Sequence, residues 1–148
     1  MKNGIGLALL LVLFTAVVLV GCTGQESLPY ALAPESKLPA FLSDAQPRTR
    51  EAYQFASANH HELEKYPCTC GCVYLNHASN ADCYIKLILP SGLMSFDQHA
   101  NGCGVCIDIT QDVMRLTREG HSPPEIRAYI DAEYSKYGPP TNTSLPVA

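Results

Sequence analysis

Three cysteines on alternate residues, in the run Pro67-Cys68-Thr69-Cys70-Gly71-Cys72, constrain this chain more than any other feature of its sequence. A Cys103-Gly104-Val105-Cys106 pair and a lone Cys83 follow downstream. Ordinary core packing does not require thiols at this density. Such thiols hold a soft metal ion, form disulfide bonds or exchange electrons. The function of the chain therefore depends largely on which of these three uses applies.

The segment 1–21 is typical of a lipoprotein signal peptide. An apolar run from Ile5 to Val20 is short for a membrane span and ends in small residues rather than in charges. The box Leu19-Val20-Gly21-Cys22 resembles a bacterial lipobox, in which the cysteine receives a diacylglycerol and starts the mature protein. We therefore expect lipidation of Cys22 and a lipid-anchored, extracytoplasmic protein at the cell membrane or outer membrane. An uncleaved membrane anchor is the alternative.

Composition divides the mature chain into three parts. Residues 22–47 hold the lipidated cysteine and a Pro-rich tether, expected to be an unstructured stalk, although its apolar patches 28–30 and 38–42 could dock on the domain or on a partner. Residues 48–138 form one Cys-rich domain of about ninety residues, a size that usually needs disulfides or a metal. The polar segment 139–148 is expected to be a disordered tail.

Charge excludes one class of partner. The chain carries 14 acidic and 10 basic residues, for a formal net charge of −4, and the basic residues are scattered along it. A nucleic-acid-binding domain would instead gather basic residues in a patch or stripe. We expect no nucleic-acid partner, and contact with the membrane only through the lipid anchor.

The hydrophobic periodicity predicts a small, mainly α-helical α+β domain. Three helices are predicted, over about residues 48–66, 103–119 and 123–138. Pro67 ends the first, and a capping box at Ser122-Pro123-Pro124-Glu125 starts the third. Between the first two helices, the β-prone run 83–89 and residues 93–96 flank a turn and predict a short hairpin. The helical side chains expected to face the core are Tyr53, Ala56, Leu63, Tyr66, Cys106, Ile109, Val113, Leu116, Ile126, Tyr129, Ile130, Tyr134 and Tyr137.

The spacing of the cysteines suits a shared site. Side chains at alternate positions of an extended segment point to one face, and curling at Gly71 would gather the three sulfurs of the run around one centre. A disulfide between Cys68 and Cys70 would close a small, strained ring. Cys103 and Cys106 lie in the first turn of a predicted helix, where the dipole favours thiolate. That pair suits either a redox couple or half of a tetrahedral metal site.

Two histidines and Cys83 extend the candidate site. His99 precedes the cysteine pair and His77 precedes Cys83, so that each imidazole could bind a metal or raise the thiolate fraction of a neighbouring sulfur. Cys83 enters the β-prone run, where burial or one bridge is expected, so it should matter chiefly for folding. The histidines at 60–61 are expected at the surface. The candidate metal ligands are Cys68, Cys70, Cys72, Cys83, Cys103, Cys106, His77 and His99.

Several runs together carry a resemblance to a known family. They are Pro67-Cys68-Thr69-Cys70-Gly71-Cys72, His77-x-x-Asn80-x-x-Cys83, Asp97-x-His99-x-x-x-Cys103-Gly104-Val105-Cys106, Glu125-Ile126-Arg127-x-Tyr129-Ile130-Asp131 and Tyr137-Gly138-Pro139-Pro140-Thr141. Over nearly the whole predicted domain, the chain resembles the bacterial PCYCGC-motif lipoproteins. Thr69 stands where the motif has Tyr, which leaves every thiol in place. Some relatives carry selenocysteine at a motif cysteine, so the resemblance implies selenol or thiol reactivity, or soft-metal ligation, rather than inert cross-linking.

The leading hypothesis is an envelope-anchored lipoprotein that binds a soft metal ion, Cu(I) or Zn(II), through clustered thiolates. Close-set thiolates favour soft ions, and six of them could support a multinuclear cluster. One alternative is a thiol–disulfide oxidoreductase or redox sensor acting on a thiol or disulfide partner protein; another is a disulfide-stapled interaction module. No Ser, His and acid grouping stands out, so no catalytic residue is predicted and binding is favoured over enzymatic activity.

Overall fold

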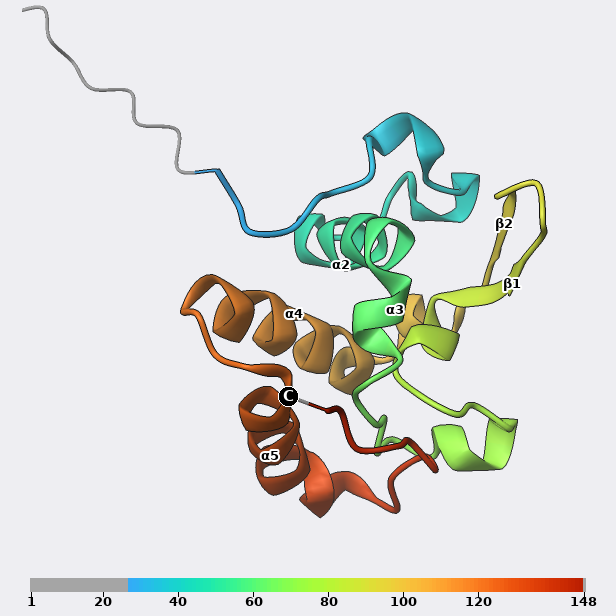
Figure 1. Cartoon of the computed structure of the whole chain (residues 1–148). Coiled ribbons are helices and arrows are strands. Elements are labelled where there is room, and N and C mark those ends of the chain that lie inside the picture. The colour runs from blue at the N-terminus through green and yellow to red at the C-terminus, as the bar shows by residue number, and fades with distance from the viewer. Residues whose placement is uncertain (1–26, 148) are drawn as a thin grey trace, which may run out of the picture.

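The computed structural model describes residues 27–147 (Figure 1). Its helices and strands are α2 (Pro47–Ala58), α3 (His60–Leu63), β1 (Ile85–Ile88), β2 (Met94–Phe96), α4 (Gly104–Arg118) and α5 (Pro123–Tyr134). Short 3-10 turns connect them. The predicted fold class, a small mainly helical α+β domain with a hairpin in its middle, is confirmed.

The predicted signal peptide and the lipidation site Cys22 lie outside the described residues. Within residues 27–147, no helix combines the length and the apolar character that crossing a bilayer requires.

Helix α4 lies at the centre of the domain, packed between α2 and α5 (Figure 1). Its predicted apolar stripe is buried: Ile109 and Val113 are fully enclosed, and Cys106 joins them at the start of the helix. Residues at spacings of three and four share one face of a helix, which is why this stripe could be predicted from sequence. The fully buried Tyr53 of α2 extends the same core on the other side.

The first predicted helix is interrupted at Asn59, which separates α2 from α3. Asn59 leaves the helical region, with φ −135° and ψ 37°, and its side-chain amide donates to the carbonyls of Phe55, at 2.9 Å, and Ala31, at 2.7 Å. An Asn side chain that bonds the backbone competes with the helical ladder. The expectation of one continuous helix over 48–66 was therefore wrong, while the predicted end before Pro67 holds.

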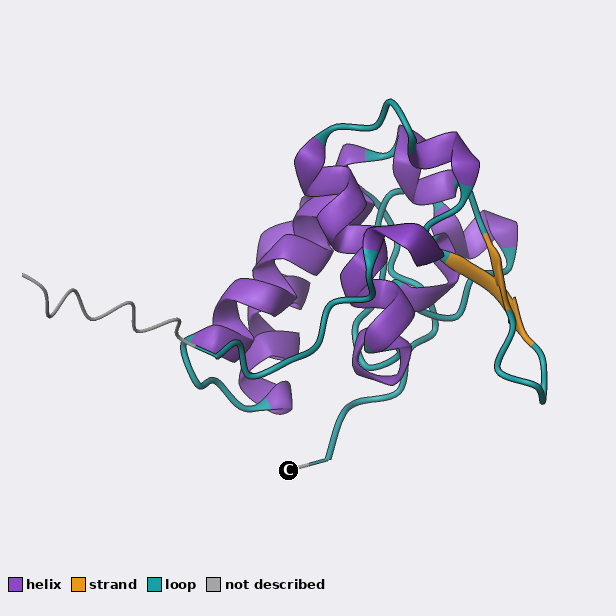
Figure 2. Cartoon of the chain, turned by 90° about the horizontal axis from the view of Figure 1, so that it is seen from above, coloured by secondary structure: helices purple, strands orange, loops and turns teal. Residues whose placement is uncertain are grey.

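The predicted hairpin is formed by antiparallel strands β1 and β2, which project away from the helices (Figure 2). Ile85 pairs with Phe96 and Ile88 with Met94, with an irregularity after Ile85. Ile85 is buried at the base of the hairpin, whereas Leu87 is half exposed farther along. The base of the hairpin is thus part of the core, and the tip is not.

From Tyr30 onward, the described part of the predicted tether lies against α2 instead of forming a free stalk. The amide of Ala33 donates to the carbonyl of Gln54 at 3.1 Å, and the ring of Tyr30 meets Phe55 edge-on with centroids 5.0 Å apart. Leu42 is fully buried. This arrangement is the docked alternative that the apolar patches had left open.

The C-terminal segment also differs from the expectation of a disordered tail. Thr141 is buried, and its amide donates to the carbonyl of Cys68 at 2.9 Å. The hydroxyl of Thr143 donates to the carbonyl of Ala78 at 2.6 Å. Residues 139–143 therefore run along the cysteine loop rather than into solvent.

Two tyrosines predicted to face the core, Tyr129 and Tyr137, are exposed. Tyr129 lies on the flank of α5, where the guanidinium of Arg115 covers its ring at 5.4 Å. The helix ends at Tyr134, so the helical spacing that pointed Tyr137 inward no longer applies there. The other predicted positions on this helix, Ile126, Ile130 and Tyr134, are buried.

Candidate metal centre

The cysteines reach one place from three parts of the chain. Gly71, at φ 92°, turns the loop in the left-handed region that glycine adopts most readily, and the 3-10 turn Cys72–Leu75 follows it. Cys83 ends a second 3-10 turn, Ala81–Cys83, just before β1. Cys106 lies in the first turn of α4, where Cys103 is the N-cap residue. The curled loop that the sequence predicted is therefore present, and α4 closes it from the other side.

Five sulfurs form one connected set of contacts inside this loop. The Sγ of Cys72 is 3.2 Å from those of Cys68 and Cys70 and 3.4 Å from that of Cys83. The Sγ of Cys106 is 3.4 Å from those of Cys68 and Cys70. A disulfide would need about 2.05 Å, whereas thiolates around a tetrahedral zinc lie roughly 3.8 Å apart, given Zn–S bonds of about 2.3 Å. The six cysteines of residues 27–147 are free thiols, and a small outward movement of the sulfurs would make room for a metal ion among them.

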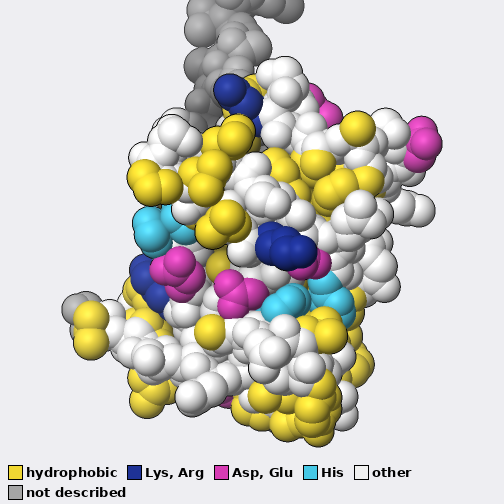
Figure 3. Space-filling view, turned by 90° about the vertical axis from the view of Figure 1, so that its right-hand side faces the viewer, with side chains coloured by type: hydrophobic (Ala, Val, Ile, Leu, Met, Phe, Trp, Pro, Cys, Tyr) yellow, Lys and Arg dark blue, Asp and Glu magenta, His cyan; other side chains and the backbone are white. Residues whose placement is uncertain are grey.

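Histidine side chains gather at separate places on the face shown in Figure 3. His99 points into the cysteine group, with Nε2 3.3 Å from the Sγ of Cys72 and 3.7 Å from that of Cys70. His77 lies behind Cys83, with Nδ1 3.5 Å from its Sγ, and contacts the His99 ring edge-on. Both predicted histidines therefore lie at the candidate site: a ring nitrogen of His99 is close to two sulfurs, and one of His77 is close to a single sulfur.

The C-terminal segment clamps the cysteine loop. The amide of Cys68 donates to the Oγ1 of Thr141 at 3.0 Å, and the amide of Thr141 donates back to the carbonyl of Cys68. The hydroxyl of the buried Thr69 donates to the carbonyl of Tyr134 at 2.8 Å. Gly138 approaches the loop so closely that an added Cβ would lie 2.8 Å from the carbonyl oxygen of Thr69. The path of the loop is therefore fixed by residues far along the chain.

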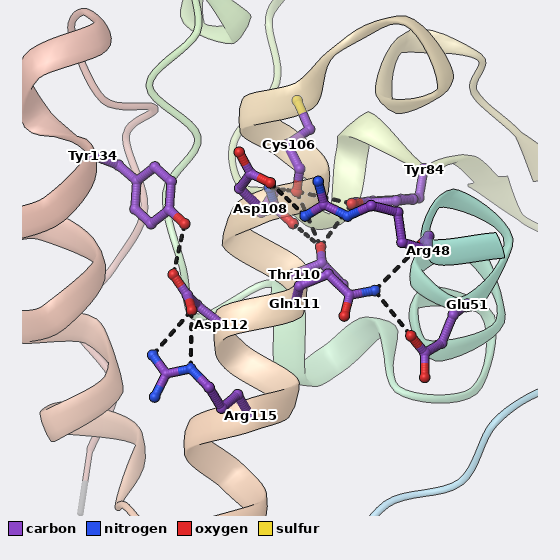
Figure 4. A network of polar contacts seen from close by, with 11 residues as sticks. Arg48, Glu51, Tyr84, Cys106, Asp108, Thr110, Gln111, Asp112, Arg115 and Tyr134 are labelled. Atoms are coloured by element: carbon purple, nitrogen blue, oxygen red, sulfur yellow. Dashed lines mark hydrogen bonds and ion pairs between the residues drawn. The ribbon is translucent and has the colours of Figure 1, made fainter. Parts of the chain in front are cut away.

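A polar network holds Cys106 (Figure 4). Its carbonyl accepts hydrogen bonds from the hydroxyl of Tyr84, at 2.9 Å, and from the amide of Asn80, at 3.3 Å. The hydroxyl of Thr110 lies 2.7 Å from Tyr84 Oη and 2.8 Å from Asn80 Oδ1, and all three side chains are buried. The Cys106 sulfur points away from these oxygens (Figure 4). Hydrogen bonds to the residue that carries a candidate donor atom hold that atom in a fixed direction, as surrounding residues do in many metal sites.

Hydrogen bonds among the thiols lower the pKa of some of them and raise the pKa of others. Bonds from Cys106, Cys70 and Cys72 hold the pKa of Cys68 well below its usual range. A hydrogen bond from Cys106 lowers the pKa of Cys103 to about 5. The same contacts, foremost that with Cys103, raise the pKa of Cys106. The group thus combines sulfurs that ionise readily with sulfurs that retain their protons. A bound metal ion would displace those protons.

The donor atoms form two groups of four. In each group the atoms lie within 4.8 Å of one another: one is Cys68, Cys72, Cys83 and Cys106, and the other is Cys70, Cys72, His99 and Cys106. Among the candidate cysteines, Cys103 alone belongs to neither group; it lies at the edge, lining a surface hollow of about 280 Å³. Cys83, expected to serve chiefly folding, lies inside the first group.

Sequence reasoning missed the residues that hold the site in place. Asn80, Tyr84, Thr110 and Thr141 are ordinary polar residues, and the only hints of a role were the place of Asn80 between His77 and Cys83 and the place of Thr141 at the end of the last motif run. A separate surface group of His60, His61 and Glu64 also brings donors together; His61 and Glu64 are exposed and His60 is partly exposed, close to the surface position expected for these histidines.

Comparison with known proteins identifies the family. The family model described as "Protein of unknown function with PCYCGC motif" matches residues 11–146, nearly the whole chain. The chain belongs to this PCYCGC family. No curated protein and no solved structure was found to match it. The PCYCGC motif is thus the part of the chain that curls around the candidate metal centre, and the resemblance stated from the sequence is confirmed.

Proposed function

We propose that this PCYCGC protein is an envelope-anchored lipoprotein that binds a soft metal ion, Cu(I) or Zn(II), through its clustered thiolates. The observation that carries the proposal is the group of Cys68, Cys72, Cys83 and Cys106, four buried sulfurs within 4.8 Å of one another. Four cysteines around one point is a common structural zinc site, and the same soft donors select Cu(I).

Burial and preorganisation support binding over inert packing. Thiolates enclosed away from water need a positive charge, because an uncompensated buried charge is costly. The hydrogen bonds on the backbones of Cys68 and Cys106 hold two of the four donors in place before an ion arrives. A domain of this size also gains stability from a bound metal, since the free energy of binding adds to that of folding.

The proposed anchor is the lipid on Cys22. The Leu19-Val20-Gly21-Cys22 box supports it, and two or more acyl chains give stable anchoring where one does not. Because the segment docks on α2 from Tyr30 onward, residues 23–29 lie between the proposed anchor and the docked segment. The metal centre would then act close to the membrane surface.

The test is a metal titration of the full chain in detergent, reduced and kept free of oxygen. Zn(II) or Cu(I) should be taken up saturably, with release of protons and protection of the buried thiols from alkylation. A Cys72→Ala/Cys106→Ala double variant should lose uptake, while Cys103→Ala, which removes a sulfur outside both groups, should retain it. Proton release is measured on the unaltered chain, so the test does not depend on whether the double variant folds. No uptake and no release would overturn the proposal.

One observation favours a second candidate, thiol–disulfide exchange. Cys103 is partly exposed beside a surface hollow, and its pKa is lowered to about 5 by the hydrogen bond from Cys106. A partly exposed thiolate with a partner three residues away is the arrangement of a redox pair. Catalytic reduction or oxidation of a disulfide substrate by the metal-free protein, lost in Cys103→Ser, would favour this candidate over metal binding.

A further inference from the structure

The two groups of donor atoms share two sulfurs. Cys72 and Cys106 belong to both; Cys68 and Cys83 complete one group, and Cys70 with His99 the other. Six donors therefore surround two neighbouring points rather than one. A single zinc ion takes four ligands in a structural site and would leave two of the six donors unused.

Resting on the proposed metal binding, we propose that the centre is binuclear and that Cys72 and Cys106 bridge the two ions. Each ion then has four donors, two of its own and two shared. The geometry suits this assignment, because the Sγ atoms of Cys72 and Cys106 are 4.0 Å apart and the remaining donors of both groups lie around this pair. Thiolate sulfur carries several lone pairs, so one sulfur can bind two metal ions at once.

Charge supports two ions over one. The six donors comprise five thiols and one imidazole. With all five thiols ionised, one divalent ion would leave a net charge of minus three in a mostly buried site, whereas two divalent ions leave minus one. Because buried charge is costly, the second ion allows all five sulfurs to ionise together. The step involves no redox change: each S–H bond breaks, its proton goes to the buffer, and sulfur–metal bonds form.

The two positions differ in exposure. The four sulfurs of the first group are all buried, whereas Cys70 and His99 of the second are partly exposed. The first ion is thus enclosed, and the second lies at the edge, where a donor from solvent or from another protein can reach it. The enclosed ion would stabilise the fold, and the outer ion is the one that can exchange.

The deciding experiment is native mass spectrometry of the full, reduced chain in detergent, titrated with Zn(II) without oxygen. Two ions per chain are expected. Saturation at one ion would overturn the binuclear assignment but leave metal binding intact, and no ion at all would overturn both. His99→Ala should lower the count from two to one, since it removes a donor from the outer position only. His121→Ala is the matched control, because His121 lies at the surface beside Glu119 and Glu125 and belongs to neither group, and it should retain two ions.

Cadmium, which replaces zinc in thiolate sites, tests bridging without any variant. In cadmium NMR of the fully loaded chain, two resonances that are scalar-coupled to each other through shared sulfurs are expected. Two resonances without mutual coupling would show two separate sites and overturn the assignment of Cys72 and Cys106 as bridges.

Discussion

Cys68 and Thr141 exchange two hydrogen bonds although they are 73 residues apart: the Cys68 amide donates to the threonine hydroxyl at 3.0 Å, and the Thr141 amide donates to the Cys68 carbonyl at 2.9 Å. Both residues are buried. The pair ties the C-terminal segment to the first cysteine of the motif. The segment thereby becomes part of the site.

Thr141→Val should weaken both the fold and the site. Valine keeps the shape of the side chain but leaves the buried Cys68 amide without an acceptor, which costs about 1–3 kcal/mol. Urea unfolding of the full chain should show this loss, and zinc affinity should fall with it. Thr117→Val is the control, since that hydroxyl only bonds the carbonyl four residues back in its own helix. Equal stabilities of the two variants would contradict the role of Thr141.

Gly138→Ala should also be destabilising, for a steric reason. Gly138 has φ 154°, and an alanine Cβ there would lie 2.8 Å from the Thr69 carbonyl oxygen, closer than a carbon–oxygen contact allows. Gly92→Ala is the matched control, because Gly92 has φ 80° but no atom near its missing Cβ. The backbone strain of about 1–3 kcal/mol applies to both. Thermal denaturation should therefore show the larger drop for Gly138→Ala, and a smaller drop there would contradict the close approach.

Local signals in the sequence predicted most of the fold. The capping box at Ser122 is present with both of its hydrogen bonds, and the stripe of α4 through Ile109 is buried. Each of these features depends on residues within two turns of one another, so a short window of sequence contains all the information. The hairpin was predicted for the same reason, because a β-prone run and a turn are local patterns.

What the sequence left undetermined depends on contacts between distant segments. The break at Asn59 involves the carbonyl of Ala31, and the clamp at Thr141 involves Cys68; neither partner is near in sequence. The motif identified the candidate donors by residue type, but not their grouping. Cys83 joins the first group only because the turn before β1 brings it within 3.4 Å of Cys72.

Cys103 should be the first thiol alkylated in the metal-free protein. Its pKa, lowered to about 5 by the hydrogen bond from Cys106, makes it a thiolate above that pH and a thiol below it. Its reaction with iodoacetamide should therefore stay nearly constant from neutral pH down to about 6 and fall as the pH drops through 5. Peptide mapping after brief labelling measures this directly, and Cys103→Ser should remove the fast reaction.

Zinc should slow that reaction without abolishing it, because Cys103 belongs to neither donor group but loses the hydrogen bond from Cys106 when the metal displaces the Cys106 proton. The other five cysteines should become protected. Protection of Cys103 to the same degree would show that it is a ligand, as the sequence had suggested.

Cys22→Ser should release the protein from the membrane. If the cysteine carries the diacylglycerol, the variant lacks the acyl mass and moves to the aqueous phase when a detergent extract is split by warming. Cys103→Ser, which removes a different cysteine, should partition with the unaltered protein. Retention of Cys22→Ser in the detergent phase would contradict lipidation at this residue.

Removing the metal with a chelator should lower the stability of the unaltered protein. The same measurement on a Cys83 variant distinguishes a metal ligand from a residue that serves folding alone. A metal that binds only the folded chain stabilises it by about 2.7 kcal/mol when free metal is a hundred times the dissociation constant. Unfolding is measured with zinc and with a chelator, and the difference is the metal-dependent part. Cys83→Ala removes a donor from the enclosed position and should shrink this difference, whereas Cys103→Ala should leave it unchanged. If Cys83→Ala instead lowers stability equally with and without zinc, Cys83 serves folding alone, as its place before a β-prone run first indicated.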